Sequence, residues 1–418
     1  MTVGRQGVRA PLATAPRSAP HAGGGDWRGV AAVLFAVAWG GNSFTPLLGL
    51  YQQALGLDEL AVNVLLAAYV VGIIPALFLS APLHRRLGPR RLLLPLAPLS
   101  ALGSLLLVAG NRGYALLFLG RAVIGLALGV AMVVGAVWLT ALCSERGGGD
   151  RGGGVGARRA ALSLTAGFGS GAAVMGVLAQ WAPAPTALPY TLHLALCAVA
   201  GVWVLRSPDV PPPTEPPGGP APPLPARTLL RVLPVAPWIF GSLGLAYAVL
   251  PQVVRPRLGG LVTVYSALLC LLSLGGGFLV QKWLARRGGW RRLSPAPVGF
   301  ALFLAVVAVT VPLLDVLSPW LVPVLCLLLG AAYGLMVAGC LVEVEATVPR
   351  ARLARAVSLV WACAYGGFAL PVAVSTAHRL LGWGNGLTLV VTATAALTVV
   401  ALGRLAAHRT PARTSETG

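Results

Sequence analysis

The sequence predicts an all-α membrane protein with twelve transmembrane helices, arranged as two six-helix bundles related by a pseudo-two-fold axis. Three observations lead to this prediction: the composition, a series of apolar runs, and the placement of basic residues between those runs. Of the 418 residues, 57% are hydrophobic and only 10% are charged, and the mean hydropathy is +0.81. Soluble domains carry roughly a quarter charged residues, so lipid is expected to solvate most of this chain.

The apolar runs give the number of helices. A helix needs about 20 apolar residues to cross a bilayer, and runs of that size recur along the whole chain. We expect helices at residues 29–50, 61–82, 92–110, 114–139, 159–181, 188–205, 229–250, 261–281, 293–314, 319–342, 356–377 and 385–405.

The basic residues give the orientation. With the N-terminus in the cytoplasm, cytoplasmic loops and tails hold 26 of the 31 basic residues. External loops hold only Arg112, Arg255, Arg257 and Arg379, and Arg121 falls within a helix. The positive-inside rule therefore predicts a multi-pass protein of the plasma membrane with both termini cytoplasmic. It also explains the net charge of +20 without nucleic acid as a partner.

The chain divides into two bundles joined by a spacer. Residues 1–27 and 407–418 are expected to be cytoplasmic tails, and the first tail lacks any periodicity that would order it. Residues 28–206 form the first bundle and 229–406 the second. Between them, residues 207–228 are rich in proline and behave as an extended, semi-rigid cytoplasmic linker.

An internal repeat supports this division. Leu83-His-Arg-Arg-Leu-Gly-Pro-Arg-Arg-Leu92 precedes Leu284-Ala-Arg-Arg-Gly-Gly-Trp-Arg-Arg-Leu293 by 201 residues, and seven of the ten positions are identical. Each copy lies between the second and third helix of its half. Independent positive-inside clusters would explain the arginines but not the shared spacing. Repeated halves related by an axis along the membrane normal are a known plan of transporters.

These loops resemble the signature of the major facilitator superfamily, which reads approximately Gly-x-Leu-Ala-Asp-Arg-x-Gly-Arg-Arg. Arg86, Gly88, Arg90 and Arg91 match its basic and glycine positions, while Arg85 stands at the acidic position and Ala81 at the leading glycine. The resemblance covers residues 28–406. It implies the fold of that superfamily and transport by alternating access.

Two weaker resemblances point to its drug-antiporter branch. Arg121-Ala-Val-Ile-Gly-Leu-Ala-Leu-Gly129 is similar to Arg-x-x-Gln-Gly-x-Gly, with Ile124 in place of glutamine. Gly167-Phe-Gly-Ser-Gly171-Ala172 is similar to Gly-x-x-x-Gly-Pro, with Ala172 in place of proline. Secondary-active efflux is what this similarity implies.

Arg121 is the first candidate for the substrate or coupling site. A guanidinium within a span costs about 2.5–3.5 kcal/mol on insertion scales, so a partner must compensate for it. It is expected either to face a central cavity and bind an anionic or carbonyl group, or to snorkel to the nearby external surface.

Polar and aromatic residues of other spans complete the candidate site. Asn42 and Thr45 belong to a kinkable stretch of the first helix, and their polar groups need partners away from lipid. They are expected to contact substrate or to bond a neighbouring helix. The aromatic candidates are Tyr247, Tyr265, Trp361 and Tyr365.

Acidic residues at the cytoplasmic ends of helices suggest a gate. Glu145, Glu343 and Glu345 lie near the repeated basic loops and are expected to pair across the halves with Arg85, Arg86, Arg286 or Arg287. Solvated loop charges are the alternative, and such pairs contribute under 1 kcal/mol. The full set of gating candidates in the two loops is Arg85, Arg86, Gly88, Arg90, Arg91, Arg286, Arg287, Gly289, Arg291 and Arg292.

We therefore expect a monomeric transporter in the lipid bilayer that exports a small organic or amphipathic compound. Uptake or facilitated diffusion of a small, anionic metabolite is the alternative, and a non-transporting membrane sensor is a further one. Protons are one candidate coupling ion, although no Asp or Glu lies deep within a span. The sequence has no catalytic constellation, no phosphate loop and no metal-ligand spacing, so no enzyme activity, cofactor or metal is expected.

Overall fold

The computed structural model describes residues 27–144, 151–210, 224–287 and 295–409. We refer to residues 27–210 as the N half and to 224–409 as the C half. Several sequence predictions fall outside the described residues. They are the two tails beyond Trp27 and Arg409, most of the linker, and the gating candidates Glu145, Gly289, Arg291 and Arg292.

The N half consists of six spans, some of them interrupted. The first span is bent at a short 3-10 turn, and the fourth contains a π-helical segment. In order the elements are α1 (Trp27–Ser43), η1 (Thr45–Leu47), α2 (Leu48–Leu55), α3 (Glu59–Leu93), α4 (Leu96–Val108), η2 (Ala109–Arg112), α5 (Tyr114–Val130), η3 (Ala131–Gly135), α6 (Ala136–Ser144), α7 (Arg151–Trp181) and α8 (Leu188–Val204).

The C half repeats this plan. Its seventh span also contains a π-helical segment, and its eleventh span consists of two helices. The elements are α9 (Ala226–Val232), α10 (Ala236–Gly244), η4 (Leu245–Val249), α11 (Leu250–Val254), η5 (Arg255–Arg257), η6 (Gly259–Leu261), α12 (Val262–Arg287), α13 (Pro295–Leu313), η8 (Leu314–Val316), α14 (Val322–Thr347), α15 (Arg350–Gly366), α16 (Ala369–Leu381) and α17 (Asn385–Arg409).

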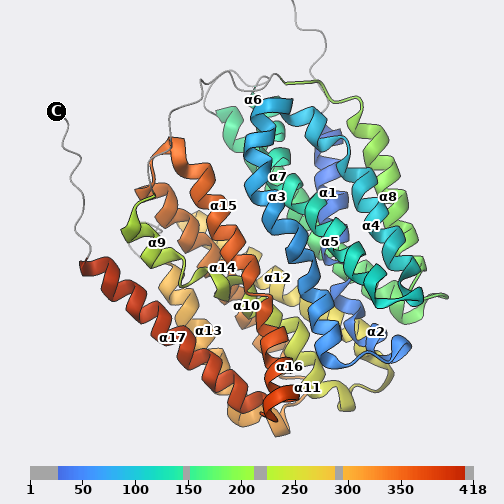
Figure 1. The fold of residues 1–418 in the computed structure, drawn as a ribbon, viewed down its shortest axis with the longest axis vertical. Coiled ribbons are helices and arrows are strands. Elements are labelled where there is room, and N and C mark those ends of the chain that lie inside the picture. The colour runs from blue at the N-terminus through green and yellow to red at the C-terminus, as the bar shows by residue number, and fades with distance from the viewer. Residues whose placement is uncertain (1–26, 145–150, 211–223, 288–294, 410–418) are drawn as a thin grey trace, which may run out of the picture.

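The predicted number of spans is confirmed. Among the described residues, ten helical stretches are long and apolar enough to cross a membrane, and two shorter apolar helices lie at Leu96–Arg112 and Leu188–Val204. The two halves lie side by side and contact each other along α3, α7, α12, α15 and α16 (Figure 1). The all-helical, twelve-span fold is therefore the one that the apolar runs predicted.

Glycines let equivalent helices of each half pack backbone to backbone. A Cβ on Gly125 of α5 would collide with the carbonyl of Tyr69 in α3. In the C half, a Cβ on Gly330 of α14 would collide with the carbonyl of Ser273 in α12. The second and fourth spans of each half thus meet in the same way, as small residues permit in membranes. This match supports the internal repeat.

The signature glycine of the first basic loop breaks a helix. Gly88 has φ 77° and ψ 166°, which lies outside the region that other residues readily adopt. The second span therefore ends there, and the chain turns into the third. Arg90 follows the break and donates from Nη2 to the carbonyl of Leu205 at 3.1 Å, which ties the loop to the sixth span.

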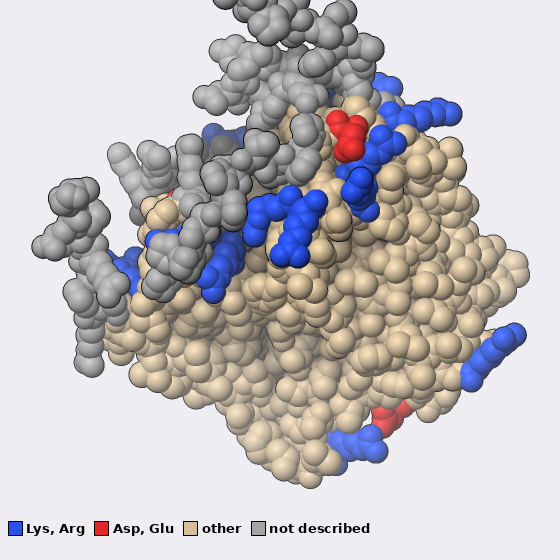
Figure 2. All heavy atoms as spheres, turned by 45° about the horizontal axis from the view of Figure 1, so that its top comes forward, with Lys and Arg blue, Asp and Glu red and all other residues tan. Residues whose placement is uncertain are grey.

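Charged side chains gather at the two ends of the molecule, and a broad uncharged belt lies between them. Figure 2 shows most Lys and Arg side chains at one end. We call it the basic end, and it includes Arg85, Arg86, Arg158 and Arg286, which are exposed. The opposite end carries Asp58 and Arg379. The arrangement agrees with the alternation of loops expected from the sequence.

Candidate functional site

A cavity lies between the two halves near the middle of the molecule. Its volume is about 70 Å³, and no charged side chain of the described residues lines it. Pockets that hold drug-sized ligands have roughly 300–1,000 Å³, so the halves must separate before a substrate can enter. The lining residues are Gly41, Asn42, Thr45, Tyr69, Met132, Phe168, Phe240, Leu243, Tyr247, Leu274, Tyr333, Trp361, Tyr365 and Phe368.

Five of the candidates named from sequence line this cavity. Tyr247, Trp361 and Tyr365 come from the C half, and Asn42 and Thr45 come from the N half. Asn42 donates from Nδ2 to the carbonyl of Phe168 at 3.0 Å and accepts from the Thr45 hydroxyl at 2.9 Å. Asn42 and Thr45 therefore form a satisfied polar edge, and one of their bonds also joins α1 to α7.

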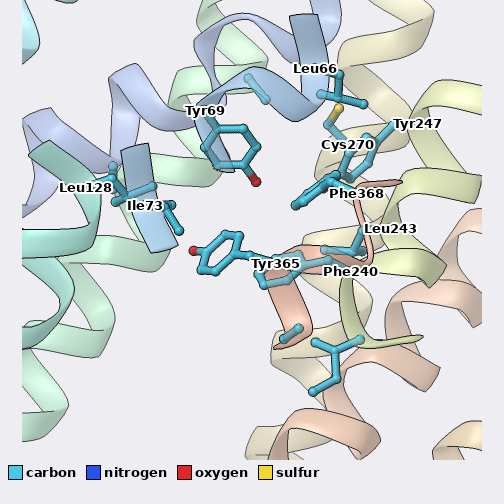
Figure 3. Close-up of a cluster of buried hydrophobic side chains, with 14 of the residues drawn as sticks. Leu66, Tyr69, Ile73, Leu128, Phe240, Leu243, Tyr247, Cys270, Tyr365 and Phe368 are labelled. Atoms are coloured by element: carbon cyan, nitrogen blue, oxygen red, sulfur yellow. The ribbon is translucent and has the colours of Figure 1, made fainter. Parts of the chain in front are cut away.

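The rest of the cavity wall is mainly aromatic. Phe240 stacks on Tyr365 with ring centroids 4.4 Å apart, and on Phe368 at 5.0 Å. Tyr69 approaches from the N half, with its ring edge-on to Tyr365 at 5.9 Å and to Phe368 at 5.4 Å. Figure 3 shows Tyr69 facing Tyr365, Phe240 and Phe368 across the boundary between the halves. Edge-to-face and offset-stacked pairs are the arrangements that aromatic rings prefer.

Two π-helical segments contribute to the wall. Met132 lies in η3 of the fourth span and Tyr247 lies in η4 of the seventh. The hydroxyl of Tyr365 contacts the sulfur of Met132 at 3.2 Å, across the two halves. Single-turn π-bulges occur frequently at functional sites, and here both turn a side chain toward the same cavity.

Arg121 lies behind the cavity and is completely buried. Its Nε donates to the carbonyl of Leu65, its Nη2 to Leu66 and its Nη1 to Gly41, at 3.2–3.3 Å. Its guanidinium carbon lies 4.5 Å from the ring centroid of Tyr69. Tyr69 and Gly41 line the cavity, whereas Arg121 does not. Its compensating partners are backbone carbonyls and aromatic faces, and the side chain does not reach the surface.

A second cavity adjoins the first on the side of the basic end. Its volume is about 60 Å³, and it shares Phe168, Leu274 and Tyr333 with the central cavity. Its other lining residues, Thr165, Phe278 and Gln281, lie closer to the basic ends of α7 and α12. The two cavities mark a path from the middle of the molecule toward the basic end.

Polar contacts between the halves close the opposite end. Asn63 is 2% exposed and donates from Nδ2 to the carbonyl of Pro371 at 3.3 Å and to Ser375 at 3.4 Å. Arg379 binds Asp58 at 2.8 Å. Four further hydrogen bonds join Gln252 to Gln52, Arg255 to Gln52, and Gln180 to the backbone of Gly260 and Val264.

One predicted substrate residue and one predicted gating residue do not lie where the sequence led us to expect them. Tyr265 donates its hydroxyl to the carbonyl of Pro319 at 2.7 Å and does not line the cavity. Glu343 binds Arg231 of its own half at 3.0 Å, rather than Arg85, Arg86 or Arg286. Glu345, the other acidic gating candidate within the described residues, is exposed. The predicted bonds across the basic end are thus not formed by Glu343 in this conformation.

The buried histidine of the sixth span is part of the packing of the N half. His193 is fully buried, with Nε2 2.9 Å from the carbonyl of Ala36 and Nδ1 2.6 Å from the Ser104 hydroxyl. A neutral ring that donates from Nε2 and accepts at Nδ1 satisfies both bonds. Among the described residues no Asp or Glu is buried.

Sequence reasoning missed most of the aromatic wall. Tyr69, Phe168, Phe240, Tyr333 and Phe368 were not singled out, because aromatic residues are common throughout the spans and a sequence does not show which face turns inward. One signal was available. Phe368 follows Trp361 and Tyr365 at spacings that place all three on one face of a helix.

Residues 30–372 match the family model described as Major Facilitator Superfamily. Comparison with curated protein sequences found no match.

Solved structures with the same fold include a POT family transporter in complex with 5-aminolevulinic acid, with a TM-score of 0.71, 12% identity and coverage of 91% of this chain and 96% of that one. The nucleoside transporter NupG has a TM-score of 0.67, 15% identity and coverage of 92% and 99%. A D-xylose-proton symporter has a TM-score of 0.62, 15% identity and coverage of 91% and 96%. The family match spans most of the chain, so the chain is a membrane transporter of small molecules that belongs to the Major Facilitator Superfamily.

Proposed function

We propose that this transporter exports a small organic, amphipathic compound across the plasma membrane by alternating access. In this proposal the basic end faces the cytoplasm, following the positive-inside rule. The halves at 28–206 and 229–406 rock about the central cavity, and substrate binds there. Asn42, Thr45, Tyr247, Trp361 and Tyr365 contact it, together with the other aromatic residues of the wall.

The observation that carries the proposal is the lining of the cavity. Eight of its residues are aromatic, and the described residues place no charge on its wall. Aromatic faces bind flat, apolar groups, and the Asn42–Thr45 edge offers hydrogen bonds to one side of a ligand. A compound with an aromatic body and a polar edge matches both surfaces.

The same geometry weighs against the uptake of an anion. An anionic substrate needs a cation in the cavity, and Arg121 is the only fully buried arginine of the described residues. Three of its N–H groups already bind backbone carbonyls. Releasing them to bind substrate would give up these charge-assisted hydrogen bonds, each worth about 1.5–3 kcal/mol.

The direction of access fits the cytoplasmic loading step that export requires. The path marked by the two cavities leads toward the basic end, while polar contacts between the halves close the other end. This conformation corresponds to one that loads substrate from the cytoplasm. Its counterpart would break the contacts of Asn63, Gln180 and Arg379 and close the basic end.

Transport into inside-out membrane vesicles tests the proposal. The probes are a radiolabelled planar aromatic amphiphile without charge, an aliphatic analogue of similar volume and a carboxylated analogue. We expect uptake in the order aromatic, aliphatic, carboxylated. Phe240→Ala should weaken uptake of the aromatic probe about 2- to 10-fold, as expected for losing an aromatic contact. Phe78→Ala, which removes a 42% exposed ring of α3, is the matched control. Preferred uptake of the carboxylated probe would refute the proposal.

A further inference from the structure

A third cavity, with charged walls, lies in the C half, outside the transport path. Its volume is about 200 Å³, and four helices, α9, α13, α14 and α17, surround it at their basic ends. The lining residues are Arg231, Val232, Ala296, Gly339, Cys340, Glu343 and Arg404. None of them lines the central cavity.

The charges in this cavity do not cancel. Arg231 binds Glu343 at 3.0 Å, and both side chains are partly buried, with exposures of 31% and 26%. Arg404 lines the same cavity from α17, and the described residues give it no ion-pair partner. Two guanidinium groups and one carboxylate leave one positive charge, so the cavity favours an anion with several acceptor oxygens, which arginine binds well.

The surroundings indicate that this anion belongs to a lipid. α13 and α17 are the most lipid-exposed sides of the cavity, because only 33% and 28% of their apolar stretches are buried. On these two helices, Val298 is 49% exposed, Leu402 60% and Leu405 56%. A soluble anion would gain nothing from these side chains, whereas acyl chains would cover them.

The depth of the cavity agrees with a headgroup. Arg404 lies near the end of α17, Ala296 at the start of α13 and Glu343 near the end of α14, so all three stand at the level of the basic loops. Basic pockets between helices on the cytoplasmic side are known to take anionic headgroups. At the basic end of the N half the packing is different. There the fully buried Trp138 donates to the carbonyl of Pro208 at 3.2 Å.

We propose that the cavity between α9, α13, α14 and α17 binds the phosphate headgroup of an anionic phospholipid. Arg404 holds the phosphate, and Arg231 is shared between the phosphate and Glu343. The acyl chains lie along the exposed faces of α13 and α17. Because α9 and α14 belong to the C half, an occupied site would bias the movement of the C half relative to the N half.

Lipid binding to the purified full-length chain tests this proposal without any transport substrate, so its outcome is separate from that of the export proposal. Native mass spectrometry is used to compare phosphatidylglycerol with phosphatidylcholine of the same acyl chains. We expect preferential binding of phosphatidylglycerol. Arg404→Gln should weaken it about tenfold, the loss expected for one charge-assisted hydrogen bond. Arg158→Gln, which removes an exposed arginine of the same end outside the cavity, should leave it unchanged.

A second variant separates recognition from damage to the fold. Glu343→Gln removes the carboxylate that competes for Arg231, so phosphatidylglycerol should bind several-fold more tightly, whereas a purely structural role of Glu343 predicts weaker binding or none. Equal binding of both lipids, or unchanged binding in Arg404→Gln, would overturn the proposal. Competition by inorganic phosphate as effective as that by phosphatidylglycerol would overturn the assignment to a lipid.

Discussion

Arg379 of α16 places Nη1 2.8 Å from Oδ2 of Asp58, and this ion pair joins the two halves at the end opposite the basic loops. Asp58 also accepts from the backbone N–H of Ala61 at 2.7 Å and so caps the start of α3. Both charged side chains are more than half exposed, at 61% and 52%. Exposed pairs contribute about 0.2–1 kcal/mol, so this contact is one that movement of the halves can break and remake.

The buried contact beside it should matter more. Asn63→Leu removes the two hydrogen bonds that its amide donates across the halves, to the carbonyl of Pro371 and to Ser375, so we expect it to destabilise the closed form of this end. Spin labels at Gln53 and Leu380, both exposed, measure the separation of the halves there. Asn63→Leu should shift the distance distribution to longer values, and Arg379→Gln should shift it less. Equal distributions in wild type and Asn63→Leu would show that Asn63 does not hold this end closed.

Arg121→Lys should impair the movement of the transporter more than its affinity. A lysine carries no planar fork and cannot reproduce bonds from Nε, Nη1 and Nη2 to three separate carbonyls. Losing one or two of these charge-assisted hydrogen bonds costs about 1.5–3 kcal/mol each, so the thermal unfolding midpoint and the maximal rate should fall. KM should change little, because Arg121 does not line the cavity.

Arg158→Lys is the matched control for this measurement, since Arg158 is exposed at the basic end and is not one of the gating candidates. A large rise in KM for Arg121→Lys at an unchanged unfolding midpoint would place Arg121 in the substrate site instead.

The polar edge of the cavity should select substrates by their hydrogen bonds. Asn42→Leu removes the amide that bonds Phe168 and Thr45, so KM should rise about tenfold for a substrate with a hydrogen-bonding edge. An analogue lacking that edge should show a much smaller change. The measurement is initial uptake at varied concentrations of the two compounds. An equal rise for both would indicate that Asn42 supports packing alone.

Matched glycines test the crossings shared by the two halves. Gly125→Ala and Gly330→Ala each introduce a Cβ that collides with a backbone carbonyl, so both should reduce the yield of monodisperse protein. A Cβ at Gly169 or Gly275 meets no atom within 4 Å. Alanine there should be neutral, or stabilising by about 0.5–1 kcal/mol. If all four variants behaved alike, the repeated close packing would not be what positions these helices.

The fold could be predicted because each span must be apolar over its full length and each basic loop must lie on one side. Those constraints act along the sequence, and they yielded the twelve spans and the repeat. The orientation of individual faces could not be predicted in the same way. Tyr69 and Phe168 turn inward because of how α3 and α7 cross their neighbours, and a uniformly apolar helix does not reveal its inner face.

Arg121 shows a different limit. Its burial within a span predicted that it needs partners, and the structure supplies them. Its neighbours are the carbonyls of Leu65, Leu66 and Gly41, which every sequence carries at every position. A partner that belongs to the backbone leaves no trace in residue types, so sequence alone could not separate a structural arginine from a ligand. The ion pair of Glu343 with Arg231 was missed because many arginines lie near that end.

Energised export through the aromatic cavity is tested by measuring whether the transported compound accumulates in proteoliposomes. Purified protein is reconstituted, and a planar aromatic amphiphile is presented to the basic end under an imposed proton gradient, and separately under a sodium gradient. We expect accumulation above the equilibrium distribution under at least one gradient, reached more slowly in Phe240→Ala and at the wild-type rate in Phe78→Ala. Flux that stops at equal concentrations under both gradients, in a protein that transports the compound, would contradict secondary-active export and identify a facilitator.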